Sequence, residues 1–337
     1  MLTVTEKLRA AQPLARGEAE AAMEEILSGR AAEPQIVEFL AALRTKGETE
    51  EELVGFATTM RRHARPIFPN GIPDGWRLVD TCGTGGDATG TFNVSTCAAF
   101  VVAGAGVRVA KHGNRSISSR CGSADVLEAL GVNLLVPPER VAECIERVGI
   151  GFLFAPALHT AMKHAMPARR RLGGRTVFNL LGPLTNPAGA RVQVMGVFAA
   201  DKMGLMAGAL AKLGVERAFV VHGADGLDEI SLSGETYVAE VNHGTVRNYT
   251  VAPEDFGLPR APLDALSGGD AAENAAIIRR ILDGERGPRR DIVLANAAAA
   301  LVAAGAAANF HDGVRLAAES LDAGAAAGKL ASLAELG

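Results

Sequence analysis

Two consecutive strand-to-helix junctions, both rich in glycine, hydroxyl and positively charged residues, constrain the fold of this chain most strongly. The first junction follows the apolar run 78–80 and contains Gly-Thr-Gly-Gly-Asp at 83–87, before a helix of small residues. The second follows the β-branched run 107–110 and continues through a polar loop into another helix. Strands that alternate with helices predict β-α units and a parallel sheet.

Both junctions have the chemistry of a phosphate-binding site. Glycines allow backbone N–H groups to approach a ligand closely, helix N-termini favour anions, and hydroxyls donate to phosphate oxygens. The spacing matches neither a Rossmann fingerprint nor a P-loop. The glycines alone are equally consistent with tight turns, but Lys111, Asn114 and Arg115 in the second loop favour phosphate binding.

Length and charge restrict the remaining possibilities. The 337 residues suffice for two domains, or for one large domain with an appendage. Hydrophobic residues make up 48% and aromatic residues only 4%, so we expect a core of closely packed aliphatic side chains. The net charge of -4 argues against nucleic acid as the main partner.

The cysteines and the hydropathy pattern indicate a cytoplasmic protein that is not in a membrane. Four cysteines show no Cys-x-x-Cys pairing, which predicts reduced thiols, and small buried cysteines are a simpler interpretation than nucleophiles. Glu6 and Arg9 interrupt the N-terminal segment, so we expect no signal peptide. No run of about 18 uncharged apolar residues predicts a membrane span.

The order of patterns along the chain predicts a small helical bundle followed by a larger α/β domain. Residues 2–63 have helical periodicity throughout, with a capping box at Thr49 and Glu52. A Pro- and Gly-rich linker follows at 66–75. We therefore expect a helical domain at 1–72 and a mainly parallel sheet flanked by helices at 73–337, with a helical insertion at about 157–176 that packs on the first domain. Candidate strands are 78–80, 107–110, 134–136, 151–154, 192–197, 217–221 and 291–294, and a hairpin is expected at 236–240 and 245–250.

Two charged segments are candidates for ligand binding. Asp228 and Glu229 follow an apolar strand, where open α/β sheets bind ligands. They are consistent with a solvated turn, but carboxylates beside a phosphate site favour Mg²⁺. The basic helix at 157–172 is by default a solvated surface, and it contains Arg169.

Several motifs together resemble the anthranilate phosphoribosyltransferase family. They are the segments at 83–87, 93–96, 111–115, 122–125, 169–176, 178–183, 225–229 and 290–296, in this order and spacing over nearly the whole chain. The resemblance implies transfer of the phosphoribosyl group of phosphoribosyl pyrophosphate to the amine of anthranilate, with release of pyrophosphate, in tryptophan biosynthesis. It also implies Mg²⁺ as cofactor and a homodimer formed through the helical domain.

The resemblance also assigns roles to individual residues. Asn114 and Arg169 would orient anthranilate, with Gly83 close to both substrates, and Lys111 would act by charge and positioning, since an aromatic amine needs no strong base. Ser95, Asp228 and Glu229 would bind magnesium. For His112 a structural role and a substrate contact both stay open. The expected substrate-binding residues are Gly83, Gly86, Asp87, Thr91, Asn93, Val94, Ser95, Thr96, Lys111, His112, Gly113, Asn114, Arg115, Ser116, Ile117, Ser118, Ser119, Ser123 and Arg169.

Two alternatives use the same fold. A pyrimidine nucleoside phosphorylase also cleaves an anomeric bond, but the loop at 111–115 and Arg169 match the anthranilate enzymes instead. A nucleic-acid-binding relative without catalysis would have a basic surface and degraded substrate motifs. This chain is mildly acidic and keeps the motifs.

Overall fold

Four helices form the amino-terminal part of the chain, which the periodicity predicts to be helical throughout. The computed structural model describes residues 1–116 and 120–337. The helices are α1 (Leu2–Arg9), α2 (Arg16–Leu27), α3 (Glu33–Lys46) and α4 (Glu50–His63). Thr49 Oγ1 accepts from the Glu52 N–H at 3.4 Å, and the Glu52 carboxylate accepts from the Thr49 N–H at 2.8 Å. The expected capping box at the start of α4 is thus confirmed.

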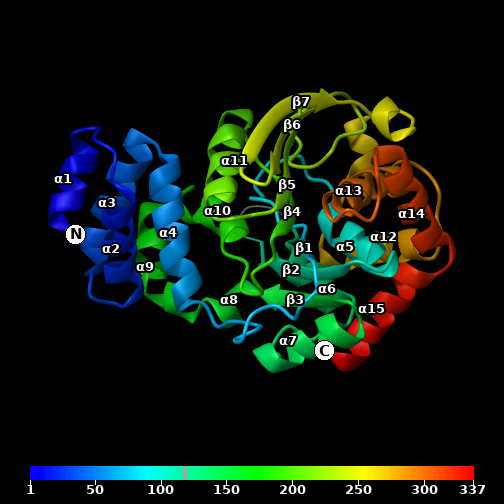
Figure 1. The fold of residues 1–337 in the computed structure, drawn as a ribbon, viewed down its shortest axis with the longest axis horizontal. Helices are drawn as coiled ribbons and strands as arrows, with labels where there is room; N and C mark the ends of the chain where they lie inside the picture. The colour runs from blue at the N-terminus through cyan, green and yellow to red at the C-terminus, as the bar shows by residue number, and fades with distance from the viewer. Residues whose placement is uncertain (117–119) are drawn as a thin grey trace.

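The described residues form one seven-stranded sheet at the centre of the molecule (Figure 1). Its order is β3-β2-β1-β4-β5-β6-β7, with parallel pairing from β3 to β5 and antiparallel pairing for β6 and β7. The mainly parallel sheet and the hairpin are as expected. The strands are β1 (Leu78–Asp80), β2 (Arg108–Gly113), β3 (Ile150–Phe154), β4 (Val192–Gly196), β5 (Arg217–Gly223), β6 (Thr236–Asn242) and β7 (Thr245–Val251).

The strand order changes direction between β1 and β4. After β1 the chain adds β2 and β3 on one side, whereas β4 pairs with β1 on its other side. In open parallel sheets, ligands bind beyond the carboxyl ends of the strands at such a switch point. The loops that follow β1, β2, β4 and β5 are therefore brought to the edge where a site is expected.

Helices cover both faces of the sheet. Side chains along each strand point alternately to the two faces, and the apolar ones must be buried on both. In β5, Phe219 and Val221 face one core, and Ala218 and Val220 face the other. The first core lies beneath the helices on the right of Figure 1. They are α5 (Val94–Gly104), α12 (Ala271–Leu282), α13 (Pro288–Ala303), α14 (Phe310–Asp322) and α15 (Ala325–Leu336).

The second core joins the sheet to the amino-terminal helices without a break. It runs from α10 (Phe178–Leu181) and α11 (Met203–Lys212) to α2, α3 and α4. The helical insertion forms as α8 (Ala155–Leu158), a 3₁₀ turn at Thr160–His164 and α9 (Met166–Leu172). Ala165 and Ala168 bury in this second core, and α9 packs on α3. The division into domains near residue 72 stays a prediction.

Two of the expected strands are wrong. Residues 134–136 form no strand and lie between α6 (Ser123–Ala129) and α7 (Pro138–Arg147), with Leu134 buried and Leu135 exposed. Residues 291–294 belong to α13, which begins at Pro288. A short apolar run does not distinguish a strand from a fully buried helix. Here α13 is buried on almost every side, so its periodicity is hidden.

Within the described ranges, no helix has both the length and the apolar character that crossing a bilayer requires. None of the four cysteines forms a disulfide with another described cysteine.

Candidate functional site

Three chain segments approach one another very closely at the carboxyl ends of β1, β4 and β5. A Cβ atom on Gly83 would lie 2.8 Å from the Gly196 carbonyl oxygen, and one on Gly196 would overlap the carbonyl oxygen of Asp228. The Thr84 N–H also donates to the Gly196 carbonyl at 2.8 Å. Glycine is therefore required here by close backbone approach, which brings the first loop against the loop of Asp228.

The loop after β1, residues 83–90, presents unpaired backbone donors. Gly85 and Gly86 have φ values of 63° and 85°, and the N–H groups of Gly85, Gly86 and Asp87 bond to none of the described residues. Thr91 ends the loop by pairing with Ser267 as an isolated bridge. Consecutive free N–H groups in such a loop suit an anion.

The N-terminus of α5 faces the same region. Asn93 bonds Asn274 on α12 at 2.9 Å and the Cys121 carbonyl at 3.2 Å, which ties both predicted loops to one helix. The Thr96 hydroxyl is buried and has no hydrogen-bond partner among the described residues. Val94 points into the core instead. A helix N-terminus with an orphaned hydroxyl fits an anionic ligand.

Three carboxylates gather beside this helix end. The Asp228 N–H lies 3.5 Å from Asp87 Oδ2, and Glu229 Oε1 accepts from the Ser95 N–H at 3.1 Å. Burial raises the pKa of Asp228, and the charges of Asp87 and Glu229 raise it further. Burial also raises the pKa of Glu229, against the opposing effect of Lys111. Carboxylates held in this way fit a divalent cation with hard oxygen ligands.

Lys111 lies beneath the first loop rather than on the surface. Its side chain is buried, and Nζ donates to the Thr81 carbonyl and hydroxyl at 3.1 Å each. Nζ also lies 3.4 Å from Ser95 Oγ. Burial lowers the pKa of Lys111, while nearby acids oppose that shift. The ammonium therefore reaches the site at Ser95, from below.

The second loop is held mainly by its own residues. The Asn114 carbonyl accepts from the Ser123 hydroxyl at 3.3 Å and from the Ala124 N–H at 3.1 Å. Gly113 adjoins Ser123, whose hydroxyl would overlap a Cβ placed there. Asp125 accepts from the Ser116 N–H at 3.0 Å. Ile117, Ser118 and Ser119 lie outside the described residues.

Arg115 points toward α6 and not toward the first loop. It pairs with Asp125 at 3.0 Å and with Glu128 at 2.8 Å, and these carboxylates raise its pKa. Positive charge in a sequence motif therefore does not by itself give a cation that faces the ligand.

His112 is buried beside a second histidine, His159. Their ring centroids are 5.1 Å apart, and His112 Nδ1 lies 3.1 Å from the Gly182 carbonyl oxygen. Burial lowers the pKa of His112 to about 3 and that of His159 to about 4. Both imidazoles are therefore neutral near pH 7.

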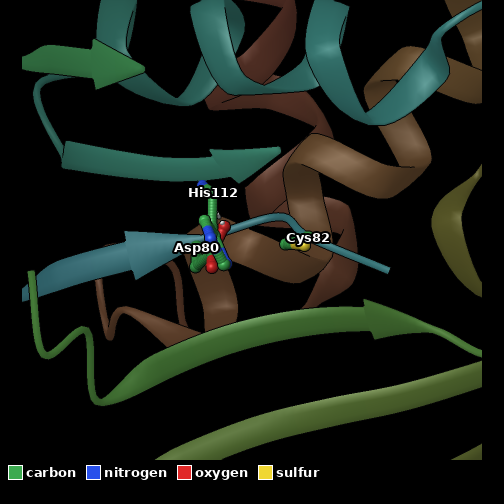
Figure 2. Close-up of side chains that lie close together, drawn as sticks. All are labelled: Asp80, Cys82 and His112. Carbon is green, nitrogen blue, oxygen red and sulfur yellow. Dashed lines mark hydrogen bonds between the residues drawn. The ribbon is translucent and has the colours of Figure 1, made fainter. Parts of the chain in front are cut away.

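Asp80, Cys82 and His112 form a group whose potential ligand atoms lie within 4.8 Å of one another (Figure 2). Asp80 already accepts from the His112 N–H at 3.1 Å and from Asn186 at 2.7 Å. Burial raises the pKa of the Cys82 thiol. Because the carboxylate has donors and the thiol stays protonated, we interpret the group as a structural network, distinct from the expected magnesium ligands.

Arg169 is half-buried on α9. Its guanidinium carbon lies 5.1 Å from the centre of the Phe178 ring, and Nη1 lies 3.8 Å from Met166 Sδ. Burial lowers its pKa. No described hydrogen bond or ion pair joins Arg169 to Asn114 or to the first loop, so its role toward anthranilate stays a prediction.

Sequence reasoning missed three residues that support the site. Gly196 ends a plain β-branched strand and has no local signal. Asn296 on α13 clamps the backbone after Glu229: its Oδ1 accepts from the Ile230 N–H at 2.9 Å, and its Nδ2 donates to the Ile230 carbonyl at 3.1 Å. Arg175 donates to the Gly86 carbonyl. The segments 169–176 and 290–296, which carry part of the family resemblance, contain Arg175 and Asn296, but neither residue is among the expected site residues. Asn296 is also a polar residue within the apolar run 292–302.

Two family models match the chain. Residues 75–327 match the glycosyl transferase family a/b domain, and residues 2–64 match the helical bundle domain of the same family. Together they account for both parts of the fold.

Relatives match over nearly their full length. The chain is 58% identical over 324 residues to anthranilate phosphoribosyltransferase of Solibacter usitatus, covering 96% of this chain and 95% of the relative. It is 55% identical to the enzyme of that name from Moorella thermoacetica, covering 97% and 95%. Among solved structures, the Thermus thermophilus enzyme has a TM-score of 0.92 at 47% identity, covering 99% and 98%. The Saccharomyces cerevisiae enzyme, solved in complex with PRPP and Mg, has a TM-score of 0.91 at 29% identity, covering 99% and 97%. This chain therefore belongs to the anthranilate phosphoribosyltransferase family.

Proposed function

We propose that this protein transfers the phosphoribosyl group of phosphoribosyl pyrophosphate to the amine of anthranilate, releasing pyrophosphate, as a step of tryptophan biosynthesis. The observation that carries the proposal is the convergence of a glycine loop, a helix N-terminus and an acidic pair, joined by the 3.1 Å bond from the Ser95 N–H to Glu229. The yeast relative is solved with PRPP and Mg and, separately, with 4-fluoroanthranilate.

Phosphoribosyl pyrophosphate would bind along the first loop and the start of α5. The free N–H groups of Gly86 and Asp87 and the orphaned Thr96 hydroxyl support this assignment. As the pyrophosphate leaves, negative charge grows on its oxygens, and fixed donors that need no reorganisation stabilise that charge best. The residues expected here are Gly83, Gly86, Asp87, Thr91, Asn93, Val94, Ser95 and Thr96.

The second loop would complete the phosphate and ribose contacts. Lys111 supports this part of the proposal, since its ammonium lies 3.4 Å from Ser95 Oγ. The loop to Ser119, with Ser123, would supply the remaining donors. The bonds from Ser123 and Ala124 to the Asn114 carbonyl keep the loop beside the start of α6.

Ser95, Asp228 and Glu229 would hold Mg²⁺. When bound there, the ion would neutralise charge that develops on the leaving pyrophosphate. The raised pKa values of Asp228 and Glu229 support the assignment, because burial, with a contribution from the neighbouring carboxylates, disfavours their negative charge until a cation is bound. Asp87 lies beside Asp228 and is one of those neighbouring carboxylates.

Anthranilate would be oriented by Asn114 and Arg169, with Gly83 close to both substrates. A guanidinium can form two parallel hydrogen bonds with a planar carboxylate. The aromatic amine is unprotonated near pH 7, so the reaction needs it held in line with the anomeric carbon rather than a general base. Burial lowers the pKa of His112 to about 3 and that of His159 to about 4, which makes both imidazoles weak bases and agrees with that requirement.

The biological setting belongs to the same proposal. We expect a cytoplasmic homodimer that associates through the amino-terminal helices, with no nucleic-acid or membrane partner. The four cysteines form no disulfide among the described residues, which agrees with a reducing compartment.

The proposal is tested by the loss of anthranilate fluorescence. Purified protein is mixed with anthranilate, phosphoribosyl pyrophosphate and Mg²⁺, with an EDTA control. We expect a loss that requires the metal and both substrates. A folded protein that causes no loss contradicts the proposal, and phosphorolysis of pyrimidine nucleosides would then be assayed instead.

A further inference from the structure

A short connection, residues 173–176, links the basic helix α9 to α10 and crosses between the amino-terminal helices and the first loop. Gly173 and Gly174 both have positive φ values, 64° and 68°, which lets the chain turn sharply. Arg44 on α3 donates to the Gly173 carbonyl at 3.0 Å. The connection is therefore fixed on the helical side.

Arg175 fixes the same connection to the first loop. Its Nη2 donates to the Gly86 carbonyl oxygen, and its guanidinium carbon lies 3.9 Å from the centre of the Phe198 ring. Phe198 is itself held at the loop, because its N–H donates to Thr84 Oγ1 at 3.0 Å. The guanidinium thus has a stacking partner that belongs to the site and one defined acceptor.

The acceptor matters because of peptide geometry. The Gly86 carbonyl and the Asp87 N–H belong to one planar trans peptide, so they point in opposite directions. Holding the carbonyl on Arg175 turns the Asp87 N–H to the other side of the loop. That N–H has no partner among the described residues, and Asp87 Oδ2 lies 3.5 Å from the Asp228 N–H.

The loop needs an external anchor. Gly85 and Gly86 both occupy positive φ, and glycine samples many backbone states at little cost. A donor array is effective only if it is oriented before the ligand binds. Lys111 is committed to Thr81 and Ser95, and Arg115 to Asp125 and Glu128, so neither orients the 86–87 peptide.

We propose that Arg175 is a positioning residue that orients the Gly86–Asp87 peptide toward the pyrophosphate group of the substrate. The proposal rests on the proposed function for the identity of that anion. It adds to the expected site a residue that acts through Gly86 and that lies in the connection after α9, the helix of Arg169.

The experiment compares Arg175→Met and Arg175→Lys with the unmodified chain. Arg170→Met is the matched control, because it removes a nearby exposed arginine, on α9, that has no partner among the described residues. Calorimetry measures the affinity for inorganic pyrophosphate with Mg²⁺, and steady-state kinetics measures both KM values. Thermal unfolding reports on stability.

Arg175→Met is expected to weaken pyrophosphate binding and to raise the KM for phosphoribosyl pyrophosphate by about tenfold, as expected when a charge-assisted hydrogen bond is lost. The KM for anthranilate should change much less. Arg175→Lys should recover part of the affinity, since an ammonium can still donate to the Gly86 carbonyl. Arg170→Met should behave as the unmodified chain.

Pyrophosphate affinity in Arg175→Met equal to that of Arg170→Met overturns the proposal, whatever happens to the melting temperature. An equal rise in both KM values also overturns it, because that result indicates general damage to the site. An unmodified chain that binds pyrophosphate but transfers nothing to anthranilate contradicts the proposed function alone, and the calorimetric comparison still decides the role of Arg175.

Discussion

Positively charged residues that are close in the sequence of this protein differ in their burial and in their partners. Lys111 near the end of β2 and Arg115 just after it belong to one sequence motif, yet Lys111 reaches Ser95 from the interior and Arg115 pairs with Glu128 on α6. Arg169 and Arg170 are neighbours, yet Arg169 is half-buried against Phe178 and Arg170 is exposed. Burial and partners, rather than residue type, separate a binding group from a solvated one.

Replacing Arg169 by alanine should affect one substrate selectively. The guanidinium is expected to bind the anthranilate carboxylate, so Arg169→Ala should raise the KM for anthranilate by about tenfold or more, with little change for phosphoribosyl pyrophosphate. Steady-state kinetics with each substrate varied in turn measures both values, and Arg170→Ala is the control. Equal changes in the two KM values would remove Arg169 from the anthranilate site.

His159 should make the stability of the protein depend on pH. Burial lowers its pKa from 6.5 to about 4, so below pH 6.5 the unfolded chain binds a proton that the folded chain does not. Folding stability then falls with decreasing pH, by about 1.4 kcal/mol per pH unit until pH approaches 4. Burial raises the pKa of Asp80 to about 6, so this carboxyl makes folding stability increase as the pH falls. Asp80 is unchanged in the His159 variant, so its effect cancels in the comparison.

The measurement is urea unfolding at pH 7.5 and at pH 5.5. The unmodified chain should lose more stability between these values than His159→Gln, because glutamine takes up no proton on unfolding. His311→Gln, which removes an exposed imidazole, is the matched control. An identical loss of folding stability between pH 7.5 and pH 5.5 in the unmodified chain and in His159→Gln would falsify the lowered pKa of His159.

At the scale of elements, the site depends on contacts between segments that are distant in the sequence. The first free N–H groups of a helix usually bond to a side chain just before it. In α5, Asn93 provides no such cap, and Glu229 accepts from the Ser95 N–H instead. The loop after β5 therefore caps the helix that follows β1, and Asn296 on α13 holds that loop by two bonds to Ile230.

A methyl group at Gly196 should break this arrangement. In Gly196→Ala the added carbon would overlap the Asp228 carbonyl, so the loop that bears Asp228 and Glu229 must move. We expect loss of most activity and a higher Mg²⁺ requirement, with the secondary structure kept. Gly204→Ala on α11 is the control, since nothing lies within 4 Å of a Cβ there. Circular dichroism and a Mg²⁺ titration of activity check both variants, and full activity of Gly196→Ala would contradict the contact.

At the scale of the whole molecule, the amino-terminal helices share a core with the sheet. The ring centroids of Phe39 and Phe56 lie 6.0 Å apart, and both rings belong to the apolar cluster that contains Met206 and Val220. The helices are thus anchored to one face of the sheet, while their outer surface leaves Leu2 66% exposed. A single exposed leucine is normal on a protein surface and does not by itself indicate an interface, so association through the helices stays a prediction.

Sedimentation equilibrium at micromolar concentration should give twice the chain mass of 34.9 kDa. Leu2→Asp should weaken the dimer, because a carboxylate at an apolar interface loses its hydration. Leu135→Asp is the control, since Leu135 is 77% exposed but lies outside the amino-terminal helices. A monomer at this concentration, or equal effects of the two substitutions, contradicts a dimer formed through the helices.

The sequence by itself determined the elements whose signals are local. Periodicity and the Thr49 capping box predicted a small helical bundle at residues 2–63. The alternating strands and glycine junctions predicted a parallel sheet with ligand-binding loops at its carboxyl edge. The signals failed at α13, where burial on almost every side hides the periodicity of residues 291–294, expected as a strand. They also failed at residues 134–136, a short apolar run that forms irregular chain with Leu135 exposed.

The tertiary structure alone decided which of these residues meet. It made Gly196 a contact of both Gly83 and Asp228, turned Arg115 away, buried Lys111 under the loop and brought Arg175 to Gly86. Arg175 and Gly86, for example, lie 89 positions apart in the sequence. The physical reason is that local propensity acts over a few residues, whereas close backbone approach and the pairing of buried charges depend on how distant segments pack.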